Sequence, residues 1–190
     1  MLDRQTTEES LAQLLQRIAG QDRQALAEFY DQTSGALFST AVRILGDAHE
    51  AEEVIQDAFL QIWGKASTFD VALGAPFYWA LSITRNRAID RLRARQRRVR
   101  LADELHEAAV SDASPFAPPT QSALSQEDLA AVRSAVNGLP GEQRQAIDMA
   151  FFGGMTHAEI AEALHEPLGT IKARIRRGML KLRESLQAYL

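Results

Sequence analysis

The stretch LPGEQRQAIDMAFFGGMTHAEIAEALHEPLGTIKARIRRGMLKLR, residues 139–183, decides the fold of the C-terminal part of this chain. Thr156 and Glu159 have the spacing of a capping box and predict the start of a short helix, which ends before a turn at residues 165–169. Thr170 then begins a last helix that is rich in basic side chains. A short helix, a turn and a second helix are typical of a helix-turn-helix, which places its second helix in the major groove of DNA.

The last helix has an apolar side and a basic side. Ile171, Ile175, Met179 and Leu182 recur at helical spacing, and we expect them to pack on Ile160 and Leu164 of the preceding helix. A solvated basic helix is the ordinary alternative, but the capping box and the turn favour the helix-turn-helix. The residues expected to face bases and phosphates are Thr170, Lys172, Ala173, Arg174, Arg176 and Arg177.

A second basic segment lies upstream, where residues 85–100 hold eight arginines and one acid. It follows an apolar and aromatic stretch that begins at Pro76, a residue suited to the first turn of a helix, so we expect one helix over residues 76–98. Interleaved apolar residues would hold this helix to a core, and a solvated Arg-rich helix end is the alternative. The outward-facing side chains suited to paired hydrogen bonds with bases are Arg85, Asn86, Arg87 and Arg91.

Charge is strongly segregated along the 190 residues. The formal net charge is −4, but residues 85–100 and 172–183 together carry fourteen of the twenty-one basic residues. The rest of the chain has seven basic residues against twenty-four acids. This distribution indicates two local anion-binding surfaces on an otherwise acidic body, as expected of a protein that holds two DNA segments at once.

The remaining pattern predicts an all-α fold with two helical domains. Residues 1–100 would form a helix bundle, residues 125–190 would contain the helix-turn-helix, and residues 101–124, with three prolines, would be a flexible linker. The other expected helices run from a capping box at Thr6 to Gly20 and over residues 22–30, 34–45, 48–63, 125–136 and 141–152, and the last helix of the chain is expected to reach residue 188.

Two further surfaces are candidates for binding. The first is an acidic stripe edged with apolar residues, which fits a protein-docking surface or an ordinary exposed face: Glu53, Gln56, Asp57 and Leu60. The second is the loop at residues 69–76, which includes Phe69 and Asp70 and is followed by Phe77, Tyr78 and Trp79. Aromatic rings beside a basic surface can stack on unpaired bases, but core packing of Phe77 and Trp79 is favoured.

Composition excludes several classes of function. The chain has no cysteine, which excludes disulfides, thiol chemistry and Cys-ligated zinc and fits a cytoplasmic protein. We expect no membrane insertion and no signal peptide, because no apolar run is long enough and the first residues lack the required pattern. There is no phosphate-binding loop or nucleophile elbow, and Glu162 with His165 is a single copy of a metal-binding spacing. The sequence therefore favours a protein that is not an enzyme and uses no cofactor or metal.

Taken together, the runs AEEVIQDAFLQIW, FDVALGAPFYW, ITRNRAIDRLR, LPGEQRQAI and MTHAEIAEALHEPLGTIKARIRRGMLKLR resemble, in order and spacing, an extracytoplasmic-function (ECF) sigma factor of bacterial RNA polymerase. The resemblance covers residues 22–98 and 125–186 and is strongest to the K-type subgroup. It implies a sigma-2 domain, a linker without an intermediate sigma-3 domain that threads toward the RNA exit path, and a sigma-4 domain.

The resemblance also implies roles. The acidic stripe, extended to Trp63, would bind the clamp helices of the polymerase β′ subunit, and the sigma-4 domain would meet the β flap. The loop with Phe69 and Asp70 would capture a base flipped from the melted −10 element, and Arg85, Asn86, Arg87 and Arg91 would bind the −10 region. The last helix would read the −35 element. An anti-sigma factor, often membrane-bound in this family, would hold the protein inactive.

The turn departs from the family pattern, which often has Gly at the position of His165 and a small apolar residue at that of Glu166. Histidine tolerates the left-handed conformation that such a turn requires, and we expect Glu166 at the surface. Two other functions stay open at this point. One is a regulator that uses the helix-turn-helix alone, and the other is a sigma mimic that binds an anti-sigma factor without binding DNA.

Overall fold

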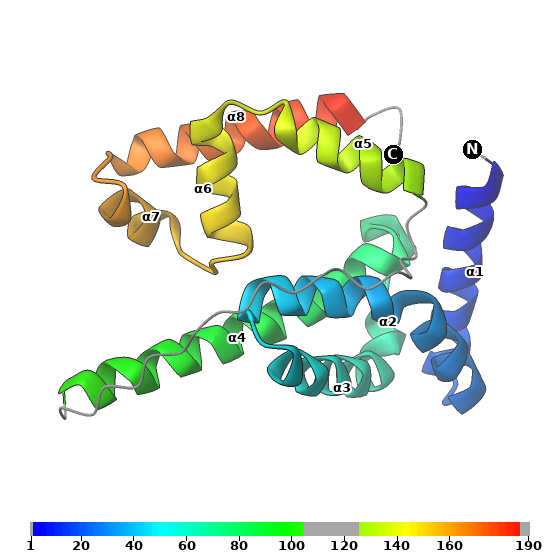
Figure 1. Ribbon diagram of the computed structural model, residues 1–190. Coiled ribbons are helices and arrows are strands. Elements are labelled where there is room, and N and C mark those ends of the chain that lie inside the picture. Colours follow the sequence, from blue (N-terminus) through cyan, green and yellow to red (C-terminus); the bar gives the residue numbers. More distant parts are fainter. Residues whose placement is uncertain (1, 105–125, 187–190) are drawn as a thin grey trace. The chain divides into compact units, whose positions relative to one another are not determined.

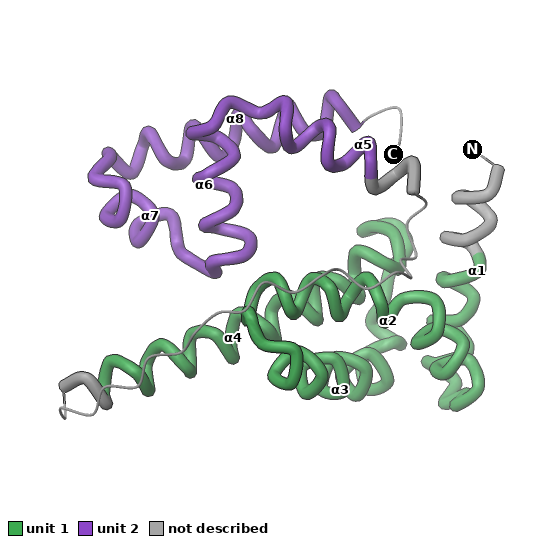
Figure 2. Tube along the Cα trace, viewed as in Figure 1, with its two compact units in different colours: residues 1–123 green, residues 124–190 purple. Residues whose placement is uncertain are grey.

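The computed structural model is helical throughout the part that it describes, which is residues 2–104 and 126–186, with side chains from residues 10–101 and 130–186 (Figure 1). This agrees with the all-α prediction. The chain divides into two compact units, residues 1–123 and residues 124–190 (Figure 2).

The first unit is a bundle of four helices around one apolar core. Its helices are α1 (Leu2–Ala19), α2 (Arg23–Leu45), α3 (Ala48–Lys65) and α4 (Pro76–Glu104), and two 3₁₀ turns, η1 (Ala66–Thr68) and η2 (Val71–Leu73), connect the last two. Each of the four helices contacts the other three, and α2 does so most extensively. The buried core takes side chains from all four helices, among them Leu15, Ile18, Phe29, Leu37, Ile55, Ile62, Phe77 and Ile83.

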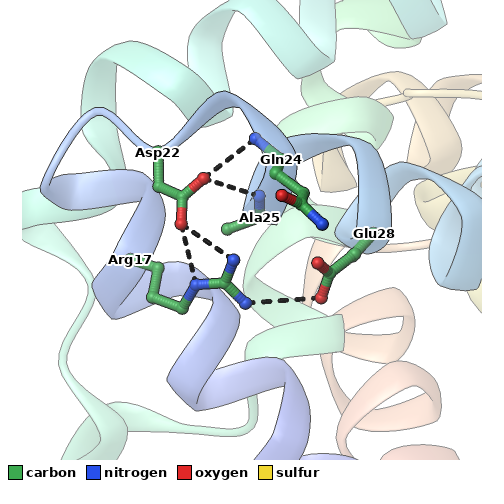
Figure 3. Close-up of polar contacts among 5 residues, drawn as sticks. All are labelled: Arg17, Asp22, Gln24, Ala25 and Glu28. Carbon is green, nitrogen blue, oxygen red and sulfur yellow. Dashed lines mark hydrogen bonds and ion pairs between the residues drawn. The ribbon is translucent and has the colours of Figure 1, made fainter.

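A network of polar contacts fixes the corner between α1 and α2 (Figure 3). The Asp22 carboxylate caps α2 and accepts hydrogen bonds from the backbone N–H groups of Gln24 at 2.9 Å and Ala25 at 3.1 Å. Arg17 donates to Asp22 at 2.9 Å and to Glu28 at 3.4 Å. The Ala25 N–H and the Arg17 guanidinium lower the pKa of Asp22, so the cap contributes at neutral pH and is lost as pH falls through that lowered pKa.

The prediction of two separate helices between residues 22 and 45 was wrong, because α2 is continuous. The polar run at residues 31–35 suggested a break. In the structure Phe29, Thr33 and Leu37 lie four residues apart on one face and are fully buried. The Thr33 hydroxyl donates to the Phe29 carbonyl at 2.7 Å, which satisfies the only polar group that this face buries. Packing of the face outweighs the weak helix propensity of the polar run.

Two helix boundaries also differ from the prediction. Helix α1 begins at Leu2, so Thr6 lies within it and is not its N-cap. Helix α4 continues to Glu104, past the predicted end at residue 98. Residues 99–104 contain no glycine or proline, so nothing in the sequence ends the helix there. Three predicted features lie outside the described residues: residues 105–124 of the linker, the start of the helix at residue 125 and the end of the last helix at residue 188.

The described part of the second unit has four helices, and the first three pack on the last: α5 (Gln126–Asn137), α6 (Gly141–Phe151), α7 (His157–Ala163) and α8 (Leu168–Leu186). Ile160 and Ile171 are fully buried, as predicted for the packing of α7 against α8. Met179 was also predicted to pack, but it is 53% exposed. The neighbouring Gly178 is buried against α6, where a Cβ atom would lie 2.6 Å from Cδ1 of Ile147.

The helix-turn-helix prediction is confirmed in local detail. The Thr156 hydroxyl accepts from the Glu159 N–H at 3.2 Å, and the Glu159 carboxylate accepts from the Thr156 N–H at 2.6 Å, which completes the capping box of α7. After α7, His165 is left-handed with φ of 52°, as expected. The Glu166 N–H donates to the Ala161 carbonyl at 2.9 Å, so the turn is a Schellman motif. Helix α8 then begins at Leu168, two residues before the predicted Thr170.

Ile62 and Leu60 on α3 give a matched pair for testing the core. Ile62 is fully buried, whereas Leu60 is 71% exposed. Ile62→Ala is expected to lower the free energy of unfolding of the first unit by about 2–5 kcal/mol, because it leaves a cavity. Leu60→Ala is expected to change it by about 0.5 kcal/mol or less. Urea unfolding followed by fluorescence measures this, since both tryptophans, Trp63 and Trp79, are in the first unit. Equal losses in the two variants would contradict this core.

Candidate functional site

The stripe on α3 is exposed for most of its length. Gln56 and Asp57 are exposed, and Leu60 presents a large apolar side chain to solvent. Trp63 at the end of the stripe is half-buried, because it packs against the core. Glu53 at the other end is half-buried too, and its Oε1 lies 3.5 Å from Nε2 of His49. The structure thus places Leu60 at the surface between polar and acidic side chains, as the spacing predicts.

Ion pairs join the N-terminal half of α3 to α4. Nη2 of Arg91 contacts the Glu53 carboxylate, and Nε of Arg91 lies 3.6 Å from Oε2 of Glu50. Nη1 of Arg95 is also 3.6 Å from that oxygen, while Nη2 of Arg95 donates to the Leu45 carbonyl at 3.0 Å. Oε2 of Glu50 is buried without a hydrogen bond, so these cations are its only compensation within the described residues. The network brings Glu53, expected to bind protein, against Arg91, expected to bind DNA.

The basic face of α4 has the predicted alternation. Ile83, Ala88, Ile89 and Leu92 are buried, while Asn86 and Arg87 are exposed. Nε of Arg87 donates to the side-chain oxygen of Gln61 on α3 at 2.9 Å. Arg85 is half-buried.

Arg85 differs from the other arginines of α4 in its electrostatic surroundings. Burial lowers its pKa, and the positive charge of Arg93 lowers it further. A guanidinium starts from so high a pKa that Arg85 is still charged at neutral pH. Arg85 therefore adds a positive charge to this side of α4, from a half-buried position that differs from the exposed position of Arg87.

The loop before α4 is ordered by its own side chains. The Phe69 ring packs edge-on against Trp79, with centroids 5.6 Å apart. The Asp70 carboxylate caps η2 by accepting from the Ala72 N–H at 2.9 Å. The loop thereby presents two aliphatic side chains to solvent, Val71 at 69% and Leu73 at 87% exposure. Phe69 and Asp70, both predicted to bind DNA, support this loop.

Core packing of the aromatic residues after the loop was the favoured alternative, and it is confirmed. Phe77 is buried, and Trp79 is half-buried against the core. Tyr78 is 43% exposed, so it is the aromatic side chain of the three that is available to a ligand. The sequence pattern marked Tyr78 only together with Phe77 and Trp79, and it did not distinguish Val71 or Leu73 within the loop. Position along a helix that begins at Pro76 could have separated Tyr78 from its two neighbours.

On α8, Lys172, Arg176 and Arg177 are exposed, and Thr170 and Ala173 are half-buried. Arg174 is different, because its side chain is only 17% exposed and its guanidinium contacts Glu142 and Glu166. A groove of 410 Å³ runs beside these residues, lined by Pro140, Glu142, Gln143, Gly169, Thr170, Ala173, Arg174 and Arg177. The start of α8 thus combines exposed cations with a groove of mixed charge.

The part of the chain that the structure describes offers no group of three or more histidine, cysteine, aspartate or glutamate side chains that could hold a metal ion. Within the same residues no helix is both long and apolar enough to cross a membrane.

Residues 29–98 match the family model of sigma-70 region 2, and residues 129–182 match that of sigma-70 region 4. The ECF RNA polymerase sigma factor SigK of Mycobacterium ulcerans is 36% identical over 180 residues, 95% of each chain. SigK of Mycobacterium tuberculosis H37Rv is 35% identical over 173 residues, 91% of each chain. This chain belongs to the ECF sigma factors. The relatives are named SigK, in agreement with the resemblance to the K-type subgroup.

As an ECF sigma factor, the chain is a promoter-specificity subunit of RNA polymerase and not an enzyme. Among solved structures, the sigma factor RpoE of Bartonella quintana in complex with the anti-sigma factor NepR has a TM-score of 0.39 and 28% identity over 80% of this chain and 90% of that chain. CnrH in complex with the cytosolic domain of CnrY has a TM-score of 0.40 and 24% identity over 94% and 98%. The family assignment rests on the sequence matches and not on these superpositions.

The ion-pair network between α3 and α4 predicts a stability role for Arg91. Arg91→Ala is expected to lower the free energy of unfolding of the first unit by about 1 kcal/mol, because it removes a partner from the buried Glu50 carboxylate. Arg97→Ala, at an exposed position of the same helix, is the control and is expected to leave stability unchanged. Urea unfolding followed by tryptophan fluorescence compares them. Equal stability of the two variants would show that the network adds nothing.

Proposed function

We propose that this ECF sigma factor binds core RNA polymerase through α3 and reads promoter DNA with two surfaces, one on α4 and its preceding loop and one on α8. The observation that supports this division most directly is that the two basic helices lie in different compact units, one in the region 2 match and one in the region 4 match. A protein with one DNA-binding surface needs only one such helix.

The α3 surface is suited to the β′ clamp helices of the polymerase. Leu60 would bury its exposed side chain in the complex, and the release of water from an aliphatic side chain favours association. Gln56 and Asp57 beside it can supply polar contacts that fix the register, with Glu53 and Trp63 at the two ends of the stripe. Residues of this kind, an apolar anchor with a polar rim, form a compact docking site.

The α4 surface and the loop would bind the −10 element. Opening DNA costs stacking and pairing free energy, which a protein offsets by holding the unpaired strand and a flipped base. Arg85, Asn86, Arg87 and Arg91 supply the polar and cationic contacts of α4. The base would lie beside the exposed loop side chains Val71 and Leu73, whose conformation Phe69 and Asp70 maintain.

The α8 surface would bind the −35 element in the major groove. Lys172, Arg176 and Arg177 are exposed and would contact phosphates or bases, and Thr170 and Ala173 lie near the start of the helix, where bases are read. The second unit would also contact the β flap of the polymerase, and an anti-sigma factor would cover both units. Such a protein acts in the cytoplasm, where the polymerase is.

Reconstituted transcription tests this function. The protein is mixed with core RNA polymerase and genomic DNA from its host, and the 5′ ends of the RNA are sequenced. New start sites that share two upstream motifs are the expected result. A regulator that uses only the helix-turn-helix would give no initiation with core polymerase alone, and neither would a sigma mimic. Absence of initiation from soluble, folded protein would therefore overturn the proposal.

Asp57 on the exposed stripe tests the polymerase-binding surface. Asp57→Arg is expected to weaken binding to core polymerase about tenfold or more, because it reverses a charge in the proposed interface. Asp31→Arg makes the same change of charge at an exposed position of α2 and is expected to bind like wild type. A fluorescence titration of labelled protein with core enzyme measures both affinities. Equal affinities would place the polymerase-binding surface elsewhere.

A further inference from the structure

Arg174 is held by two carboxylates from other parts of the second unit. Nη2 of Arg174 lies 3.0 Å from Oε2 of Glu142 on α6, and it donates a hydrogen bond of 2.9 Å to Oε1 of Glu166 in the turn before α8. The side chain of Arg174 is 17% exposed, whereas those of Glu166 and Glu142 are 35% and 71% exposed. The Glu166 pair is therefore the less solvent-screened of the two and contributes more.

The backbone places Glu166 for this contact. His165 takes the left-handed conformation, and the Glu166 N–H closes the Schellman motif on the Ala161 carbonyl. The chain direction at Glu166 is thereby set by the end of α7, and Pro167 follows at once before α8 begins. The surface position expected for Glu166 was thus only partly correct, since its carboxylate is turned toward Arg174.

We propose that Arg174 positions the recognition helix and does not contact DNA. Its guanidinium links α6, the turn and α8, so it fixes the first two turns of α8 relative to the rest of the unit. Two carboxylates already outweigh its single charge, and a phosphate would have to displace them. The exposed cations Lys172, Arg176 and Arg177 have no such carboxylates in contact among the described residues. The inference rests on the proposed role of α8 as the −35 reader.

The direction in which one substitution changes promoter affinity distinguishes a DNA-binding role of Arg174 from a positioning role. If Arg174 bound DNA, Glu166 would compete with the phosphates, and Glu166→Gln would strengthen promoter binding. If Arg174 is a positioning residue, Glu166→Gln loosens α8 and weakens binding, although an acid has been removed from a DNA-binding surface. We expect a loss of about three- to tenfold in affinity. Glu162→Gln is the matched control, since Glu162 is exposed on α7, and it is expected to bind as wild type or slightly tighter.

The experiment measures binding of the holoenzyme to promoter duplexes mapped by the reconstituted transcription, over a range of salt concentrations. Affinity falls with salt concentration, and each phosphate contact that is lost reduces the magnitude of the slope of log affinity against log salt by about 0.9. Arg177→Ala is expected to reduce that magnitude by about this amount. Arg174→Ala is expected to weaken binding and to leave the slope as in wild type. Tighter promoter binding by Glu166→Gln would overturn the proposal. A salt slope of smaller magnitude in Arg174→Ala would overturn it as well.

Hydrogen exchange of the full-length chain without polymerase provides a readout that does not depend on the promoter. Arg174→Ala and Glu166→Gln are expected to speed amide exchange at the start of α8. The control Glu162→Gln is expected to leave exchange there unchanged. Unchanged exchange in both variants would overturn the positioning role. A failure of the proposed sigma function would give a different result. The wild-type holoenzyme would then not bind the promoter, while the variants without polymerase would still show this exchange pattern.

Discussion

The burial of one face of α4 is the constraint on which the first unit depends. This helix supplies Phe77, Ile83 and Ile89 to the core and also carries the arginines of the proposed −10 surface. An arginine can lie beside buried positions only if its guanidinium reaches water or an acid, because an unpaired buried charge is costly. Helix α3 provides those acids at Glu50 and Glu53. The same helix supplies the proposed polymerase surface, so the two binding faces of the unit share one set of charges.

The local signals in the sequence predicted most of the fold. The capping box of Thr156, the left-handed residue at His165 and the proline at the start of α4 depend on nearby residues, and all appear in the structure. The break predicted within α2 was wrong for a different reason. The polar residues at 31–35 have weak local propensity, and the packing that overrides it involves Phe29, Thr33 and Leu37 against other helices, which spacing alone does not show.

The candidate site could be predicted less completely, because side-chain pairing joins residues far apart in the chain. The sequence marks Arg91 and Arg174 as basic residues on helices that bind nucleic acid. It does not show that Glu53 contacts the first or that Glu142 and Glu166 contact the second. Nor does it show that Phe69 packs on Trp79 and leaves Val71 and Leu73 as exposed aliphatic side chains of the loop. These contacts change which residues are available to DNA.

Acidic partners beside both basic helices also bear on how a protein of net charge −4 can select promoters. Each surface alone is expected to bind DNA weakly, because carboxylates contact some of its arginines and the rest of the chain is acidic. When the polymerase holds both units on one DNA molecule, binding at the first element raises the effective concentration of the second surface, and the affinities multiply. A single element in bulk DNA would then retain little protein, whereas two elements at the correct spacing would retain the holoenzyme. Weak individual surfaces therefore favour selection of the complete promoter, which a strongly basic protein would lose to nonspecific binding.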